Sequence, residues 1–287
     1  SVIAHALNYY DGNAFSGLAL GSIGDYGALV RSETLLITDE VISDAYGANV
    51  PECFKTTPDW SDSNGYPAAF EGELQNSDER LGYKDRRTGL PDHTPGWYAE
   101  VARMKYDFQE GSISNPVGLT LESKDVFENR STVEYDDYGL MTVNAKQWLN
   151  ATDYLETVAE YDYRILQPFK ITDPNDNISV VDFSPLGLLK ATALIGKGTE
   201  GDYKSSTGGF YDKYAPSVIM EYDFHAFANQ GQPIWVKTTQ REQHYQDEET
   251  SPTIEKVEYS DGFGRLLQTR SQAEDVIFEN SALDADQ

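Results

Sequence analysis

The sequence predicts an all-β fold in which antiparallel hairpins form an extended sheet. Its 287 residues include 19 Tyr, 12 Phe and 23 Gly, and the Tyr and Phe residues often stand beside Asp, Gly or Asn. Aromatic residues favour strands, and Gly, Asp and Asn favour tight turns. The second observation is an internal repeat built from these residue types, which is typical of folds made from stacked or paired small units.

The first third of the chain predicts strands interrupted by an irregular segment. A Gly-rich run over 17–27 precedes an apolar, alternating stretch over 28–38, which indicates a loop and then a strand, with a short helix as the alternative. Residues 47–96 are rich in Pro, Gly, Asp, Ser and Asn, and they contain Trp60, Tyr66 and Phe70. These aromatic residues need a place to be buried, so we expect a loop-rich insertion and not a linker. A strand-like pattern resumes over 97–108.

The repeat occupies the remainder of the chain. Two copies of the repeat have an aspartate, an aromatic residue and a glycine at identical offsets. In the first copy, Asp136 directly follows the aromatic residue. Three related units contain a tyrosine followed at once, or after one residue, by an aspartate. The repeat positions are Tyr135, Asp136, Gly139, Tyr161, Asp162, Asp173, Asn175, Asn177, Phe183, Gly187, Tyr222, Asp223, Tyr259, Asp261, Gly262, Gly264 and Arg265.

Each repeat unit is interpreted as a hairpin. Residues 173–177 supply side chains that cap their own turn or tolerate a positive φ, residues 178–183 supply a strand, and Gly187 permits the next reversal. A unit this short cannot bury its own apolar face, so neighbouring units must pair edge to edge in an extended sheet. The spacing of the repeat aromatics favours a ladder that holds adjacent strands together over a platform that stacks sugars.

The organisation that follows is two consecutive segments of one continuous structure. Residues 1–110 are expected to form a first segment of sheet that contains the insertion at about 47–96, and residues 111–287 form the repeat-built segment. The chain is expected to be a fragment of a larger protein.

The composition argues against several classes of protein. A formal charge of −26 disfavours a nucleic-acid binder, because phosphate recognition depends on Lys and Arg, and an anionic membrane surface would also repel the chain. The acidic residues indicate a self-repelling, soluble surface or, alternatively, an acidic wall that faces a basic guest. Cys53 is the one cysteine, which excludes an internal disulfide framework, and we expect it to be buried.

Candidate chemical motifs are weak. Residues 196–201 satisfy Gly-x-Gly-x-x-Gly, but no amphipathic helix follows to hold a pyrophosphate, so we expect a loop and no cofactor. Residues 173–177 imitate the start of a calcium loop, but Ile178 and Ser184 stand where Gly and Glu are required, which favours a turn. The four histidines are far apart in sequence, so we expect no metal site. An all-β hydrolase with an acid pair has no positive signal of its own.

The repeat residues resemble those of the YD-repeat, or RHS, proteins. The runs 161–168, 171–175 and 186–187, with 191–193, are similar to the later part of the B component of insecticidal Tc toxin complexes. Residues 258–269 with 272–274, and residues 8–12 with 17–18, fit the same region. Asp176 departs from the Gly that is usual in this turn, and Leu140 and Leu188 stand where Arg often follows the repeat glycine.

The resemblance implies a structural role. In this family the B and C components close into a hollow cocoon of spirally wound β-strands that holds a toxic polypeptide, and a β-propeller in B docks on the pore-forming A component. We therefore expect a secreted, non-enzymatic wall segment. Its partners would be the remainder of the B component, the C component and its enclosed polypeptide, with the A component reached indirectly. The family's self-cleaving aspartyl protease site belongs to the C component, so the resemblance implies no catalytic residue here. The alternative is a cell-surface adhesion or carbohydrate-binding protein built from the same repeats.

Overall fold

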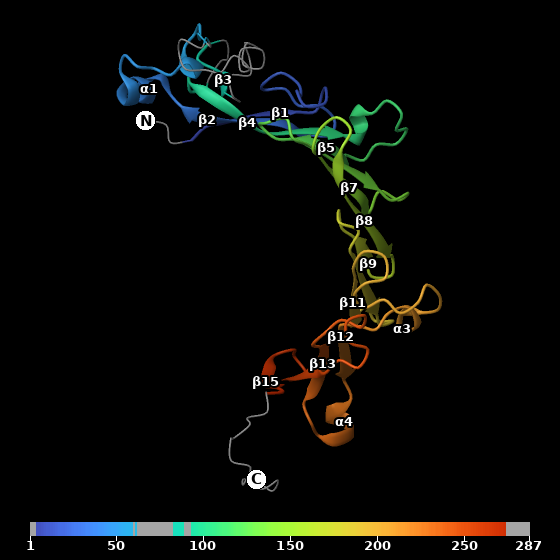
Figure 1. Cartoon of the computed structure of the whole chain (residues 1–287). Coiled ribbons are helices and arrows are strands. Elements are labelled where there is room, and N and C mark those ends of the chain that lie inside the picture. Colours follow the sequence, from blue (N-terminus) through green and yellow to red (C-terminus); the bar gives the residue numbers. More distant parts are fainter. Residues whose placement is uncertain (1–3, 60, 62–82, 89–92, 274–287) are drawn as a thin grey trace. The chain divides into compact units, whose positions relative to one another are not determined.

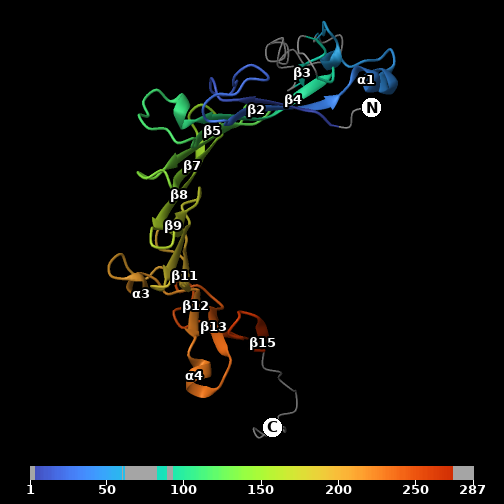
Figure 2. The same ribbon diagram turned by 180° about the vertical axis from the view of Figure 1, so that it is seen from behind.

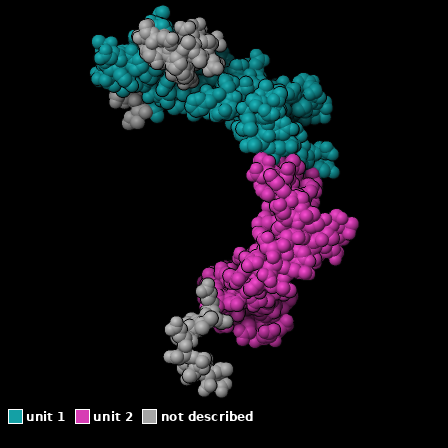
Figure 3. All heavy atoms as spheres, viewed as in Figure 1, with its two compact units in different colours: residues 1–156 teal, residues 157–287 magenta. Residues whose placement is uncertain are grey.

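The computed structural model describes residues 4–59, 61, 83–88 and 93–273 (Figure 1). The chain divides into two compact units, Ser1–Glu156 and Thr157–Gln287 (Figure 3). Every strand pairing within these units is antiparallel. The predicted all-β, antiparallel fold class is confirmed. Trp60, Tyr66 and Phe70, which we expected to anchor the insertion, lie outside the described residues.

The first unit is a sheet whose strands lie in the order β1-β2-β4-β5-β6-β7, with β3 paired to β4. One edge of the ten-residue strand β4 pairs with β2. The other edge pairs with β3 along one part of its length and with β5 along another. The strands are β1 (Ala6–Tyr10), β2 (Leu29–Ile37), β3 (Tyr83–Asp85), β4 (Trp97–Tyr106), β5 (Thr120–Lys124), β6 (Arg130–Tyr135) and β7 (Thr142–Trp148).

The second unit is a meander in which each strand pairs with the next one along the chain (Figure 2). Its first strand, β8 (Tyr154–Asp162), contains the division between the units. The other strands are β9 (Gln167–Thr172), β10 (Ile178–Phe183), β11 (Leu189–Ile195), β12 (Val218–Asp223), β13 (Ile234–Arg241), β14 (Thr253–Ser260) and β15 (Leu266–Ser271). The strand predicted over 178–183 coincides with β10.

The helices of the described residues are short. The stretch over 28–38 forms a strand, as its alternation predicts, and the helix α1 (Asp39–Tyr46) begins after it, with the Thr38 hydroxyl accepting a hydrogen bond from the Val41 amide at 3.4 Å. None of the helices in the described part of the chain has the length and hydropathy of a membrane-spanning segment. The others are η1 (Glu52–Phe54), η3 (Asp107–Gln109), α3 (Phe210–Lys213) and α4 (Ala226–Gln230).

Each unit has a small cluster of buried apolar side chains. In the first unit it consists of Leu7, Tyr9 and Tyr98; in the second it consists of Val180, Ala193 and Ile195. Such clusters are small for sheets of this length. The fold is therefore specified largely by the backbone hydrogen bonds between strands and by the turns that set the strand register.

The single cysteine, Cys53, is half-buried. The expectation that it is buried was therefore wrong.

Candidate functional site

The repeat hairpins are the candidate functional feature of this chain, and each turn is built around one aspartate. In the turn between β9 and β10, Asp173 Oδ1 accepts hydrogen bonds from the Asn175 amide at 2.8 Å and from the Asn177 amide at 2.9 Å. Asp173 Oδ2 accepts another from Asn177 Nδ2 at 2.9 Å. The Asn177 side-chain hydrogen bond is the main reason that the pKa of Asp173 lies below its usual range. The five residues therefore form a self-capped turn.

The same turn occurs twice more. Between β5 and β6, Asp125 accepts from the amides of Phe127 and Asn129 and from Asn129 Nδ2. Between β14 and β15, Asp261 accepts from the amides of Phe263 and Arg265, and Arg265 Nε takes the place of the asparagine amide at 2.7 Å. Asparagine and arginine are thus equivalent as the last residue of this turn.

The fourth position of each turn has a left-handed backbone. Glu128, Asp176 and Gly264 occupy it with φ of 66°, 65° and 79°. Gly139 and Gly187 hold the same position in two further turns. Asp136 is the capping aspartate of the first of these turns, and Ser184 takes the place of the aspartate in the second. A glycine is the least strained residue there. Asp176, identified above as a departure from the family pattern, therefore adopts the conformation of the glycine that it replaces.

Three tyrosines fasten their strand to a neighbour through the hydroxyl group. The Tyr222 hydroxyl on β12 donates to the Leu189 carbonyl on β11 at 2.8 Å, and the Tyr135 hydroxyl on β6 donates to the Thr120 carbonyl on β5 at 3.0 Å. Burial raises the pKa of both phenols. The Tyr106 hydroxyl on β4 makes the equivalent bond to the Leu29 carbonyl of β2 at 2.8 Å. These rings hold adjacent strands together.

Tyr106 belongs to a copy of the repeat that sequence reasoning missed. The run Met104-Lys105-Tyr106-Asp107-Phe108 matches Met220-Glu221-Tyr222-Asp223-Phe224, and in both the tyrosine hydroxyl also lies near the methionine sulfur. Both tyrosines stack on the phenylalanine two residues later, with interplanar angles of 12°. The shared Met-x-Tyr-Asp-Phe pattern was the signal that could have revealed this copy.

The other predicted repeat residues lie at strand ends and turns. Tyr161 opposes Pro168, Phe183 opposes Leu189 and Asp223 opposes Trp235 across their hairpins, while Tyr259 opposes Gln268. Asp162 accepts from the Arg164 amide at 3.0 Å and binds its guanidinium. Gly262 is an exposed position in the turn headed by Asp261. These residues are spread over successive hairpins and do not converge on one point.

A buried carboxylate, also missed from sequence, fastens three segments of the second unit. Asp202 is fully buried, and its oxygens accept hydrogen bonds from the Leu194 amide at 3.0 Å, the Tyr245 amide at 3.3 Å and the Ser217 hydroxyl. His244 Nδ1 lies 3.0 Å from Asp202 Oδ1. Asp202 ties the long β11–β12 connection to the loop after β13.

A buried charge network holds the first unit. Glu33 on β2 is fully buried and forms a two-pronged pair with Arg86, at 2.7 Å and 2.8 Å. Arg31 contacts both Glu33 and Glu100, and its guanidinium lies 3.8 Å from the centre of the Tyr9 ring. Hydrogen bonding to Glu33 raises the pKa of Arg86. Because the charges are paired, this network fixes β1, β2 and β4 to the segment around Arg86.

Large apolar side chains project from four of the described turns. Each stands immediately before the left-handed residue, where polar residues are common. Their exposed fractions are 77% for Phe127, 74% for Tyr138, 81% for Leu186 and 90% for Phe263. Each of these side chains is thus largely exposed to solvent at the tip of its own hairpin.

Comparison with solved structures shows which known fold this is. A chain of the TcdB2-TccC3 crystal structure superposes with a TM-score of 0.61 and 17% sequence identity over 92% of this chain. The chain shares its fold with part of a Tc toxin. A TcdB2-TccC3-Cdc42 structure and a Photorhabdus luminescens Tc holotoxin pore with a mutated TccC3 give the same TM-score at 16% identity, each over 94% of this chain.

The likeness covers a small part of those proteins. This chain spans 12% of the first solved chain, 15% of the second and 14% of the third. No protein-family profile matches the sequence, and no curated protein matches it.

No group of His, Cys, Asp or Glu within the described residues is placed to hold a metal ion. The run 196–201 forms a tight connection: Gly201 has a φ of 71°, and a Cβ there would lie 2.4 Å from the Leu194 carbonyl oxygen. What the residues form is a succession of capped hairpins, fastened laterally by tyrosine hydroxyls.

Proposed function

We propose that this chain is a section of the structural wall of a hollow, toxin-encapsulating shell in a Tc-type toxin complex, and that it is not an enzyme. The observation that carries the proposal is the organisation of the sheet: strands follow one another in chain order, and the apolar clusters within the described part of each unit are small. Such a sheet is suited to forming one layer of a larger wall.

The proposal includes the repeat assignment. The Asp-headed turns and Tyr-to-carbonyl bonds recur from hairpin to hairpin, which supports the interpretation of the chain as a YD-repeat sheet. The solved structures that share this fold are TcdB2-TccC3 complexes and a Tc holotoxin pore. By that similarity the partners are the remainder of a B-type component, a C-type component and its enclosed polypeptide, in an extracellular complex.

The adhesion alternative depends on exposed repeat aromatics that could stack sugars. In the structure Tyr135, Tyr161, Phe183, Tyr222 and Tyr259 are all half-buried. The hydroxyls of Tyr135 and Tyr222 are bonded to neighbouring strands. These contacts favour a holding role for the repeat aromatics over a sugar platform.

Co-assembly tests the wall proposal. We would express the chain alone and together with the remaining B-type and C-type segments, and measure molar mass by size-exclusion chromatography with light scattering. We expect association of unpaired sheet edges when the chain is alone and a discrete complex when the other segments are present. A stable monomer that ignores those segments would contradict the proposal.

A matched pair of variants links assembly to the hairpins. Gly187→Val should prevent incorporation, because Gly187 has a φ of 80° and its Cβ would lie 2.7 Å from Ile165 Cγ2. Gly111→Val is the control, since a Cβ at Gly111 meets nothing within 4 Å. Equal incorporation of both variants would show that the β10–β11 hairpin is not required for the wall.

A further inference from the structure

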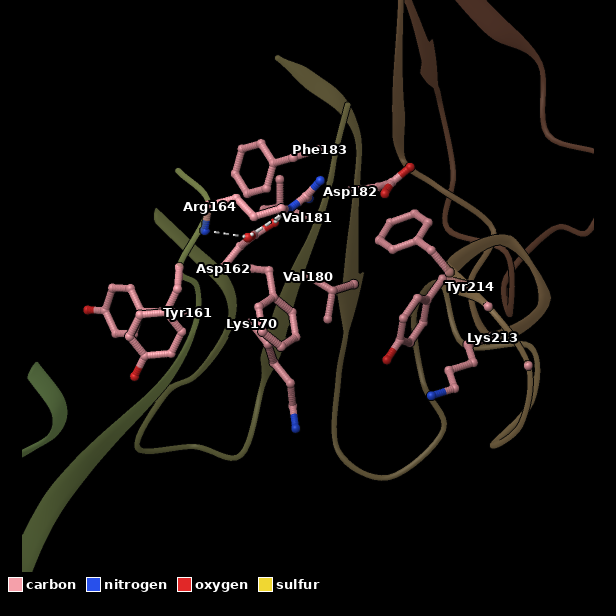
Figure 4. Close-up of a pocket in the computed structure, with 15 residues that line it drawn as sticks. Tyr161, Asp162, Arg164, Lys170, Val180, Val181, Asp182, Phe183, Lys213 and Tyr214 are labelled. Atoms are coloured by element: carbon pink, nitrogen blue, oxygen red, sulfur yellow. Dashed lines mark hydrogen bonds and ion pairs between the residues drawn. The ribbon is translucent and has the colours of Figure 1, made fainter. Parts of the chain in front are cut away.

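The second unit contains a pocket that the wall role does not use. Its cavity volume is about 610 Å³, and it lies between the β8–β9 hairpin, strand β10 and the segment around α3 (Figure 4). Apolar and aromatic side chains dominate its lining, including Val180, Phe210 and Tyr214. Val180 is buried, and Phe210 and Tyr214 pack against the apolar cluster to which it belongs. The pocket therefore has an apolar floor that is anchored to the core of this unit.

Each charged side chain that lines the pocket, except Lys213, forms an ion pair with a residue of opposite charge. Asp162 is paired with Arg164, Asp182 with Lys190 at 2.9 Å, and Lys170 with Glu160 at 2.7 Å. Lys213 also lines the pocket, and among the described residues its ammonium group has no ion pair. This uncompensated cation stands out in a chain whose formal charge is −26.

A second donor lies near this ammonium group. The Tyr214 hydroxyl has no hydrogen-bond partner within the described part of the chain, and in Figure 4 it lies on the same side of the pocket as the end of the Lys213 side chain. Lys170, on β9, lies across Val180 from Lys213 in the same view. Apolar walls with a few convergent polar groups are the usual makeup of a binding pocket.

We propose that this pocket binds a carboxylate attached to an apolar body, with the carboxylate on Lys213 and Tyr214 and the apolar body against Val180 and Phe210. Charge complementarity selects the anion, because an ammonium and a phenol are both donors and a carboxylate accepts from both. The apolar floor selects a ligand with an aromatic or large aliphatic group. All residues of this site belong to the second unit, so the binding proposal does not depend on the assembly proposed above.

Such chemistry occurs in free aromatic acids and at a polypeptide C-terminus that ends in an apolar residue. We would titrate the whole chain with indole-3-propionate and with acetyl-Gly-Phe bearing a free C-terminus, and follow binding by ligand-observed NMR. A dissociation constant of about 1 mM is the expected scale for ligands of this size. Tighter binding of the peptide would identify a chain terminus as the natural ligand, and tighter binding of the indole acid would identify a free acid.

Amide analogues of the ligands and variants of the chain test whether Lys213 and Tyr214 bind the carboxylate. Indole-3-propionamide and the peptide amide should bind about tenfold more weakly, as should the acids to Lys213→Met, because each change removes a charge-assisted hydrogen bond. Tyr214→Phe should weaken binding about threefold. Lys197→Met, in an exposed position outside the pocket, is the matched control and should leave binding unchanged.

The proposal fails under three results. Equal affinity for acids and amides would show that the carboxylate is not recognised. Equal weakening by Lys213→Met and Lys197→Met would show that only the overall charge matters. No binding to the folded chain at 10-fold the expected dissociation constant, or about 10 mM, would show that the pocket does not take this class of ligand.

Discussion

Asp176 and Gly264 occupy the same left-handed position in two turns of the same geometry, with φ of 65° and 79°. Both turns begin with a capping aspartate, Asp173 in one and Asp261 in the other. A non-glycine residue in this conformation is strained, whereas glycine is not, although glycine loses more chain freedom on folding. The capping hydrogen bonds of the aspartate thus hold residue 176 in a left-handed backbone conformation that is strained for a non-glycine residue.

The first prediction is that Asp176→Gly stabilises the second unit. Relief of the left-handed strain should exceed the entropic cost of glycine and raise the free energy of unfolding by about 0.5–1 kcal/mol. Urea denaturation followed by circular dichroism measures this change. Asn175→Gly is the control: it lies in the same turn but is not among the residues with positive φ, so it should be neutral or destabilising. Stabilisation by both variants would show that position 176 is not special.

The second prediction concerns acid. Hydrogen bonding from Asn177 lowers the pKa of Asp173, and hydrogen bonding from the Arg265 backbone lowers that of Asp261. A carboxyl whose pKa is lower in the folded state contributes stability above its unfolded pKa of about 3.9, and this contribution is lost as the pH falls through the folded value. We therefore expect the wild-type chain to be more stable than Asp173→Asn at pH 7, with the difference shrinking below about pH 4.

Asp137→Asn serves as the control for that experiment, because the Asp137 side chain has no hydrogen bond among the described residues. Urea midpoints measured from pH 7 to pH 3 give the comparison. A difference between wild type and Asp173→Asn that stays constant over this range would contradict the role of the ionised carboxylate.

The third prediction tests the lateral fastening by tyrosine hydroxyls. Tyr222→Phe leaves the ring but removes the donor to the Leu189 carbonyl, so it should cost about 1 kcal/mol of unfolding free energy. Tyr106→Phe and Tyr135→Phe should each cost a similar amount. Tyr26→Phe is the control, since its ring stacks on Phe108 at 4.2 Å and its hydroxyl has no bond among the described residues. If Tyr26→Phe cost as much as Tyr222→Phe, the hydroxyl bond would not be the source of the effect.

Local patterns in the sequence predicted much of this fold. The capping run 173–177, the strand that follows it and the reversal at Gly187 depend on neighbours within a few residues, and all three are present in the structure. The three-residue strand β3 was not predicted, because it is too short to show a period. Local reasoning also found the turn aspartates but could not identify the apolar residues beside them as exposed.

The buried polar groups could not be predicted from local pattern. Glu33 and Arg86 stand far apart in sequence, and the pair forms only because β2 and the segment after β3 both lie against β4. Asp202 similarly depends on three separate segments meeting. No hydrophobic alternation or motif distinguishes Glu33 or Asp202 from the other acidic residues, of which the chain contains 48 in all. Such contacts become visible only when the topology is known.

The last prediction is that Asp202→Ala detaches one region of the second unit before the remainder unfolds. The substitution leaves the Leu194 and Tyr245 amides and the Ser217 hydroxyl without their buried acceptor. Unsatisfied buried donors cost about 1–3 kcal/mol each in sites that cannot admit water, and water will reduce this sum where the loops open. We therefore expect a loss of about 3 kcal/mol, concentrated in residues 196–217 and 242–249.

Hydrogen exchange measured by mass spectrometry distinguishes this local effect from global weakening. Peptides covering the two regions should exchange much faster in Asp202→Ala, while peptides from β9 and β10 keep their wild-type rates. Asp212→Ala is the matched control: Asp212 accepts from the Gly209 amide at 2.9 Å, but it is exposed, so water can replace it. A uniform rise in exchange across β9 to β15 would show that Asp202 supports the whole sheet, and the assignment of a local fastening role would be wrong.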